Sequence, residues 1–577
     1  MRRALICSAA LALAVMMGAQ APAPGPTPGK AQATYQALVG DYFASEWRAS
    51  PTGATANGLH DYDGELDDVS AAAHAAEAAR LDATVRRLRA LDAGQLAPMD
   101  RDDRDILAAQ IDGQLLEETV VQQWRHNPDT YVGLMTGAVY SLVERDFAPL
   151  SERMKSAISR ENRIPAMLAD AKRNLVDMPP VFIDIALENL AGAESFLGKD
   201  APAAFGAVTD PALKTQFAAS TKATLAAVAD YKAFLIAQKS SAHGDFKLGR
   251  ENLQRLLASD MINVPVAQVM AVGRAQLAKD HAAFVETSKR VDPADPAGAL
   301  ALIAKDHPDG AHLVGVAHDQ LASLQGFIDS HHILTLPSRI LPVVAETPAF
   351  QRAEVFGELD PPGPLETHST TAYYYITPPD LTLPKDQQEG YLEYFNTALL
   401  QNLSVHEALP GHFVQYLFAR ANPGWSMVRK TAHSYTATEG WAHYTEQMML
   451  DEGLGDGDPK LRLTQLQDAL LRDCRLVASL AMHTGEMTLE QATTMMEQEC
   501  FQPVSVGPKE ARRGTSDPGY FSYALGKLEI IKLREDVRKQ EGKDFSLARF
   551  HDRFLNAGLV PIAMIRREIM GVDGPVL

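Results

Sequence analysis

Helical periodicity is the feature that most constrains the fold of this chain of 577 residues. From about residue 35 to residue 333, apolar residues recur three and four positions apart, which is the spacing of amphipathic helices. Only residues 334–385 carry strand signals, and helical spacing then continues to the C-terminus. The sequence therefore predicts a mainly α protein with a small β insert, built from an N-terminal helical half (34–333) and a C-terminal half (334–577).

The β insert contains a run of β-branched and aromatic residues at 370–377, closed by Pro378 and Pro379. Proline directly after a strand is typical of a sheet edge. We therefore expect an edge strand over 371–377 whose free backbone groups pair with an extended peptide, with Tyr373 and Tyr375 among the contacts. The alternative is an ordinary strand in a small sheet with residues 340–345.

One motif combines two histidines and a glutamate, His406-Glu407-Ala408-Leu409-Pro410-Gly411-His412. Two imidazoles and a carboxylate that can act as a base are what a catalytic zinc site takes from its first helix. The usual spacing is H-E-x-x-H, whereas a continuous helix would point these histidines about 120° apart. Pro410 and Gly411 could form a bulge that brings His412 back beside His406. The alternative is a chance cluster on a kinked surface helix.

A second amphipathic segment contains Glu439, His443 and Glu446. Glu439 and His443 lie one helical turn apart on a common face. A glutamate on a second helix is the ordinary third ligand of such a zinc site, and His443 or Glu446 could orient a ligand from behind. The alternatives are a solvated charge at Glu439 and a core histidine at His443.

A third segment begins at Asp517, a favourable helix N-cap, and predicts a helix to about residue 540 that ends at Gly542. Tyr520, Tyr523 and Lys527 share one face of this helix. A phenol held over a metal can donate to the oxyanion of peptide hydrolysis, with Tyr523 as the first candidate and Tyr520 as the second. The alternative is that both tyrosines pack with their hydroxyls at a rim.

Three cations near this segment are candidates to bind a substrate carboxylate. Arg512 and Arg513 directly precede the predicted helix, and Lys527 lies on it. Arginine binds a carboxylate through two parallel hydrogen bonds, which suits a cleft that receives the end of a peptide. Because surface arginines are common, ordinary solvated side chains are the alternative.

The three motifs together resemble the signatures of the bacterial domain-of-unknown-function 885 family. The matching segments are 406–412, Glu439-Gly440-Trp441-Ala442 and 518–527. That family is remotely similar to the helical zinc peptidases of the thimet-oligopeptidase-like and angiotensin-converting-enzyme-like groups. The resemblance implies a zincin-like helical fold with a deep cleft, one Zn²⁺ per chain held by His406, His412 and Glu439, and Glu407 as general base. It supplies no substrate.

The N-terminus carries an export signal. Arg2 and Arg3 precede an apolar run and then small residues, which predicts a Sec-type signal peptide over 1–21, followed by a Pro-rich tether over 22–33. Cys7 lies inside the apolar run rather than after it, which argues against a lipid anchor. We expect a periplasmic or secreted protein with no stable membrane insertion after signal cleavage.

Charge and cysteine content limit the partners. Loss of the two arginines takes the formal charge from −19 to −21, and so acidic a surface excludes nucleic acid. Cys474 and Cys500 could pair or remain free thiols. The sequence leaves the oligomeric state open.

These features together predict an exported zinc metallopeptidase that hydrolyses short or unfolded peptides. The alternatives are a zinc hydrolase of a non-peptide amide or ester, which would use the same residues, and a catalytically silent binding protein on the same fold. The presence of Glu407 disfavours the silent protein, since such a protein can lose its general base freely. Whether cleavage is internal or terminal stays open.

Overall fold

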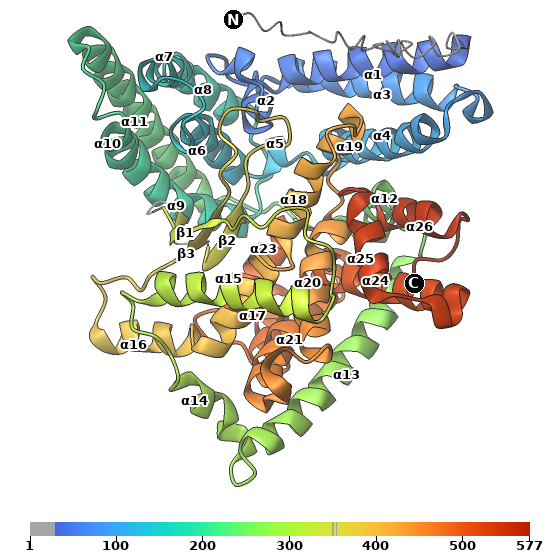
Figure 1. Cartoon of the computed structure of the whole chain (residues 1–577). Coiled ribbons are helices and arrows are strands. Elements are labelled where there is room, and N and C mark those ends of the chain that lie inside the picture. The colour runs from blue at the N-terminus through green and yellow to red at the C-terminus, as the bar shows by residue number, and fades with distance from the viewer. Residues whose placement is uncertain (1–28, 349–350, 353–354) are drawn as a thin grey trace, which may run out of the picture.

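The computed structural model describes residues 29–348, 351–352 and 355–577. The predicted signal peptide and residues 22–28 of the predicted tether lie outside this part of the chain, and helix α1 begins at Lys30. The fold is mainly helical with one small sheet, which confirms the predicted class (Figure 1).

The helices that precede the sheet fill the N-terminal half. Their bounds are α1 (Lys30–Ala49), α2 (Pro51–Ala56), α3 (Ala71–Arg89), α4 (Pro98–Leu116), α5 (Gln123–His126), α6 (Asp129–Val143), α7 (Leu150–Glu161), α8 (Ile164–Asn174), α9 (Pro180–Ser195), α10 (Ala201–Ala204), α11 (Pro211–Lys239), α12 (Gly249–Ser259), α13 (Val266–Val291), α14 (Ala299–Ala304) and α15 (Leu313–Ser330).

The sheet and the helices after it carry the three motifs. Their bounds are β1 (Val343–Glu346), β2 (Gly357–Asp360), β3 (Tyr373–Ile376), α16 (Lys385–Tyr394), α17 (Thr397–Glu407), α18 (His412–Ala421), α19 (Met427–Thr431), α20 (Tyr435–Asp451), α21 (Pro459–Thr484), α22 (Leu489–Gln498), α23 (Gly507–Ser516), α24 (Ser522–Glu541), α25 (Leu547–Asn556) and α26 (Ile562–Met570).

The packing joins the two halves. Helices α6–α11 surround a core of their own, in which Ile183 and Tyr231 are fully buried. Helices α12–α15 instead pack against the C-terminal half, where α13 lies along α21 and α15 lies beside α17. The sheet lies between the α6–α11 group and the pair α15 and α17 (Figure 1). The C-terminal motifs are therefore surrounded by helices from both halves.

The sheet has the strand order β1-β3-β2, with β3 parallel to β1 and antiparallel to β2. The expected pairing of β3 with the segment near 340–345 is present. However, β3 is the central strand and not the predicted edge, because β2 covers its other side. Three of its four residues are buried, as suits a central strand.

A glycine pair sets the distance between α20 and α24. A Cβ on Gly440 would lie 2.5 Å from the Cα of Gly526, and a Cβ on Gly526 would lie 2.1 Å from the carbonyl oxygen of Thr436. The two backbones therefore touch at this crossing, which only glycine permits. Since Glu439 precedes Gly440 and Tyr523 lies one turn before Gly526, the contact brings the second and third motifs together.

Candidate metal centre and cleft

The two histidines of the first motif lie on either side of a helix break. Helix α17 ends at Glu407 and α18 begins at His412, with a turn between them in place of the predicted bulge. Pro410 cannot donate a helical hydrogen bond, and its peptide bond to Leu409 is cis. The two imidazole rings lie 4.9 Å apart, centre to centre, and are nearly perpendicular.

Two residues of the motifs hold this turn. The Gly411 N–H donates to the carbonyl of Val405 at 3.0 Å, and a Cβ at position 411 would lie 1.7 Å from the carbonyl oxygen of His406. The indole Nε1–H of buried Trp441 donates to the carbonyl of Pro410 at 2.9 Å. The glycine and the tryptophan thus fix where His412 begins its helix.

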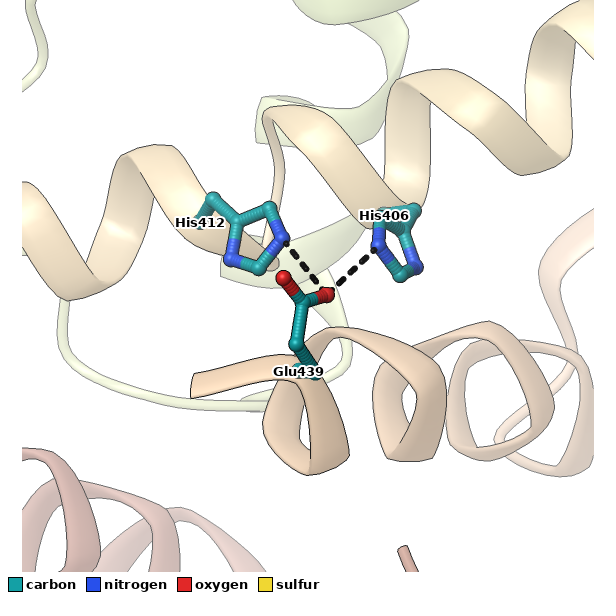
Figure 2. Close-up of side chains that lie close together, drawn as sticks. All are labelled: His406, His412 and Glu439. Atoms are coloured by element: carbon teal, nitrogen blue, oxygen red, sulfur yellow. Dashed lines mark ion pairs between the residues drawn. The ribbon is translucent and has the colours of Figure 1, made fainter. Parts of the chain in front are cut away.

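Glu439 completes a set of three candidate metal ligands (Figure 2). Its Oε2 atom lies 3.7 Å from Nε2 of His406 and 3.5 Å from Nε2 of His412, and the three ligand atoms all lie within 4.8 Å of one another. Two atoms bound to zinc at about 2.0–2.1 Å in a tetrahedral site are separated by roughly 3.3 Å. The donor set and its spacing fit Zn²⁺.

Each ligand histidine is oriented from behind by a hydrogen bond. His406 donates from Nδ1 to Oε1 of Glu446 at 2.6 Å, and Nδ1 of His412 lies 3.0 Å from Oε1 of Gln415. Gln415 is itself held by the carbonyls of α20. Both histidines therefore present Nε2 to Glu439, as metal-bound histidines do. Glu446 was a sequence candidate for this role, whereas Gln415 was not.

The electrostatics of the cluster favour positive charge. Burial opposes protonation of His406, but hydrogen bonds to Glu439 and Glu446 outweigh it and raise its pKa to about 9. Burial likewise opposes ionisation of Glu439, yet His406 and His412 hold the pKa of Glu439 well below its usual range. A metal cation bound by these three side chains could neutralise the buried carboxylate in place of the protons on the two imidazoles.

Glu407 lies next to the cluster and contacts the sheet. Its Oε2 atom accepts a hydrogen bond from the Leu359 N–H at 2.8 Å, so this edge of β2 faces the candidate metal ligands. Backbone groups alternate along a strand, so Gly357 points its N–H and C=O to the same side as Leu359. The edge predicted at 371–377 is therefore found at 357–360 instead.

Tyr373 and Tyr375 do not reach the cleft. Both lie on central strand β3, where their rings stack on each other at 5.4 Å. The residues that line the cavity come instead from β2 and the segment before it. The structure does not bring these tyrosines to the predicted substrate site, because β2 and not β3 borders the cavity beside the candidate metal ligands.

The third motif is divided by a turn. Helix α24 begins at Ser522 and not at the predicted Pro518, since Asp517 closes α23 and residues 518–521 form a turn. Tyr523 lines the cavity, with its ring 6.4 Å from that of His406. Tyr520 points elsewhere and donates its hydroxyl to Glu510. Only Tyr523 is therefore available to a substrate.

Two arginines surround the Tyr520 ring. The guanidinium carbons of Arg475 and Arg513 lie 4.4 and 4.6 Å from its centre, and Arg475 also lies 5.0 Å from the Tyr523 ring. Arg475 donates two hydrogen bonds to the carboxylate of Glu510, which neutralises its charge. The carboxylate of Asp517 lies 3.9 Å from the guanidinium of Arg513. No local pattern signals Arg475, because its partners lie far along the chain.

The candidate metal ligands form part of the wall of a cavity of about 730 Å³. Glu188 and Asn189 of α9 line it together with β2, α17, α21 and α23, so both halves of the chain contribute. Arg512 and Arg513 also line it, as predicted, and Arg512 is paired with Glu188 at 3.0 Å. This contact joins α23 to α9.

Lys527 does not line this cavity. Its side chain is only 2% exposed, and its Nζ atom lies 4.0 Å from Oδ2 of Asp280 on α13. Because α24 crosses α20 so closely, residue 527 points into the interface with α13 and α21 instead of the cleft. The structure therefore does not bring Lys527 to the predicted carboxylate site.

The two cysteines form a disulfide. Cys474 of α21 is bonded to Cys500, just after α22, with a Cα–Cα distance of 6.4 Å, so the pairing that the sequence left open is present. Within the described residues, the helices are too short or too polar for any of them to span a bilayer.

Comparison with known proteins identifies the family. The model of "Bacterial protein of unknown function (DUF885)" matches residues 51–569, so the chain belongs to this family, as its three motifs predict. It is similar to a protein from Shewanella oneidensis provisionally described as a lipoprotein of unknown function, with 26% sequence identity, a TM-score of 0.77 and coverage of 93% of this chain and 99% of that one.

A protein from Colwellia psychrerythraea, also provisionally described as a lipoprotein, shares the fold at 19% identity. Its TM-score is 0.76, with 93% of this chain and 99% of that one covered. Among curated proteins, none matches this chain.

Proposed function

We propose that this protein is a zinc-dependent peptidase that acts on short or unfolded peptides. The observation that carries the proposal is the cluster of His406, His412 and Glu439, whose ligand atoms lie at distances that suit zinc, with Glu407 beside it in a cavity.

The chemistry follows from the positions of the side chains. Zinc held by His406, His412 and Glu439 would supply a Lewis acid that polarises a carbonyl and acidifies water. Glu407 is held at one oxygen by Leu359, accepts the proton of the attacking water at the other, and passes it to the leaving amine. Burial raises the pKa of Tyr523, so its hydroxyl stays protonated and donates to the developing oxyanion.

The walls of the cavity suit a short peptide. The outward N–H and C=O of Gly357 can pair with an extended substrate, in the manner of strand addition. Arg513 lies on the opposite wall, formed by α23, where its side chain is 52% exposed and stacked on Tyr520. A peptide that spans the cavity from β2 to α23 would bring its C-terminal carboxylate to Arg513.

Export is part of the proposal. The two similar structures come from proteins provisionally described as lipoproteins, a class that is exported. The buried disulfide between Cys474 and Cys500 suits an oxidising compartment, and the N-terminal residues have the pattern of a signal peptide. We infer a periplasmic or secreted location.

Metal content joined to cleavage mapping tests the function. We expect the purified protein to contain about one zinc per chain by elemental analysis and to cleave members of a mixed peptide library, with products identified by mass spectrometry. Parallel assays with acyl amides and esters separate a peptidase from a hydrolase of other amides. Full zinc content without turnover of any of these substrates would favour the alternative of a catalytically silent binding protein.

We expect substrate recognition to depend on Arg513. A charge-assisted contact to a carboxylate contributes about 1.5–3 kcal/mol, so amidation of the substrate C-terminus should lower kcat/KM roughly ten- to a hundredfold. In Arg513→Ala the free-acid peptide should be cleaved as poorly as the amidated one.

Arg512→Ala is the matched control, because Arg512 is already paired with Glu188 and should keep the preference for the free acid. Equal cleavage of both peptides by the unmodified enzyme would exclude a carboxylate site and favour internal cleavage.

A further inference from the structure

The N-terminal half supplies one part of the cavity wall. This part comes from the first residue of α6 and from one face of α9, and it consists of Asp129, Ile185, Glu188 and Asn189. The candidate metal ligands and the proposed catalytic groups all belong to the C-terminal half. A few well-placed polar groups on the wall of a cavity fix the orientation of a ligand and decide which ligands are accepted.

Most carboxylates of the cavity wall outside the metal cluster are paired with an arginine. The pairs are Glu188 with Arg512, Asp468 with Arg472, Glu510 with Arg475 and Asp517 with Arg513, at nitrogen–oxygen distances of 2.7–3.9 Å. Asp129 differs from them. Among the described residues, the amide of Asn189 is the only partner of its carboxylate, and no basic side chain contacts it.

Asp129 and Asn189 together form a group of hydrogen-bond acceptors. The Nδ2 atom of Asn189 lies 3.1 Å from each carboxylate oxygen of Asp129, so the amide donates to the carboxylate. The amide oxygen of Asn189 accepts no hydrogen bond within the part of the chain that the structure describes. Both carboxylate oxygens also keep free lone pairs. The ligand that complements such a group carries a positive charge and several N–H donors, as an ammonium does.

The protein holds this carboxylate in position by itself. Asn127 accepts the Asp129 N–H at 3.0 Å, and the hydroxyl of fully buried Tyr231 donates to the carbonyl of Pro128 at 2.8 Å. Burial raises the pKa of Asp129, and the hydrogen bond from Asn189 opposes this only in part. A cation bound at Asp129 would offset the desolvation of the carboxylate, as arginine does for the other carboxylates of the wall.

We propose that Asp129 and Asn189 bind an ammonium group of the peptide substrate. The group is either the N-terminal α-ammonium or the side chain of a lysine, since both present the same charge and the same three N–H donors. Asp129 contacts the ammonium and determines specificity, and Asn189 orients the carboxylate. The inference rests on the proposed function, because it needs a peptide in the cavity, and it adds a positive charge that the substrate must carry.

Peptides that differ by a single charge test the inference. The starting peptide is one that the protein cleaves or binds, with a free N-terminus and one lysine. N-acetylation removes the first ammonium, and replacement of lysine by norleucine removes the second. One of these changes should lower kcat/KM roughly ten- to a hundredfold, and it thereby identifies the source of the ammonium.

Asp129→Asn should abolish this preference. The new amide oxygen can still accept from Asn189, so the local structure is kept while the charge is lost. The unmodified peptide should then be cleaved as poorly as the modified one, and the modification should have no further effect. Asp184→Asn is the matched control, because Asp184 also lies on α9 but is paired with Lys239 outside the cavity. This variant should keep the full preference.

Binding measurements separate this inference from the proposed function. Calorimetry of the same peptides with Glu407→Gln needs no turnover, and loss of the ammonium should weaken binding by a similar factor. Cleavage or binding that ignores both ammonium groups would overturn the inference and leave the peptidase standing. A protein that neither binds nor cleaves any peptide would overturn both. The comparison of peptides requires no change in the protein, so it decides the question even if Asp129→Asn does not fold.

Discussion

Alanine at His406, His412 or Glu439 should abolish zinc binding while the protein stays folded. Each change removes one of three protein ligands, and the remaining two cannot hold a catalytic zinc ion at ordinary concentrations. We expect the zinc content to fall from about one per chain to background in each variant, measured by elemental analysis after gel filtration. Circular dichroism should show unchanged helix content.

His433→Ala is the control for this experiment. His433 is an exposed histidine just before α20, lines a neighbouring cavity and is not part of the candidate ligand set. Its replacement should leave zinc bound. Full zinc occupancy in His412→Ala would mean that the turn at 408–411 does not serve to bring a second ligand to the metal.

Glu407→Gln should keep the metal and lose turnover. The amide oxygen of glutamine can still accept the Leu359 N–H, so the side chain keeps its position, but the amide cannot take a proton from water. General-base catalysis contributes about 10²–10⁴-fold, and kcat should fall by a factor in this range, with KM little changed. Steady-state kinetics on a peptide found by cleavage mapping measure both.

Glu358→Gln, on β2 in the same cavity wall, controls for loss of negative charge near the metal. It should keep most of the turnover. Loss of zinc from Glu407→Gln would instead make Glu407 a ligand and would require a different base.

The parts of the site that the sequence predicts are those encoded over short distances. His406, His412, Glu439 and Glu446 fall within one segment of the chain, where helical spacing and a Pro-Gly turn define which side chains share a face. The structure brings these residues together. The mainly helical class was also predicted, because long amphipathic patterns identify helices with few errors.

The parts that the sequence did not predict depend on distant partners. The order of the sheet is an example, because β2 reads Gly-Glu-Leu-Asp, which has low strand propensity and forms only against β3. The start of α24 is another, since a favourable cap at Asp517 is overridden when residues 518–521 turn to put Tyr520 between two arginines. Lys527 shares a helical face with Tyr523 in sequence, yet α13 and not the cleft receives it.

The backbone contact between Gly440 and Gly526 has a consequence for how this protein can vary. A tight contact between two side chains can usually be relieved by a smaller residue on either side. Here both partners are already the smallest residue, so a side chain at one position cannot be accommodated by any substitution at the other. Single changes at either position have no second-site suppressor within the pair, and selection for restored function would have to shift a whole helix.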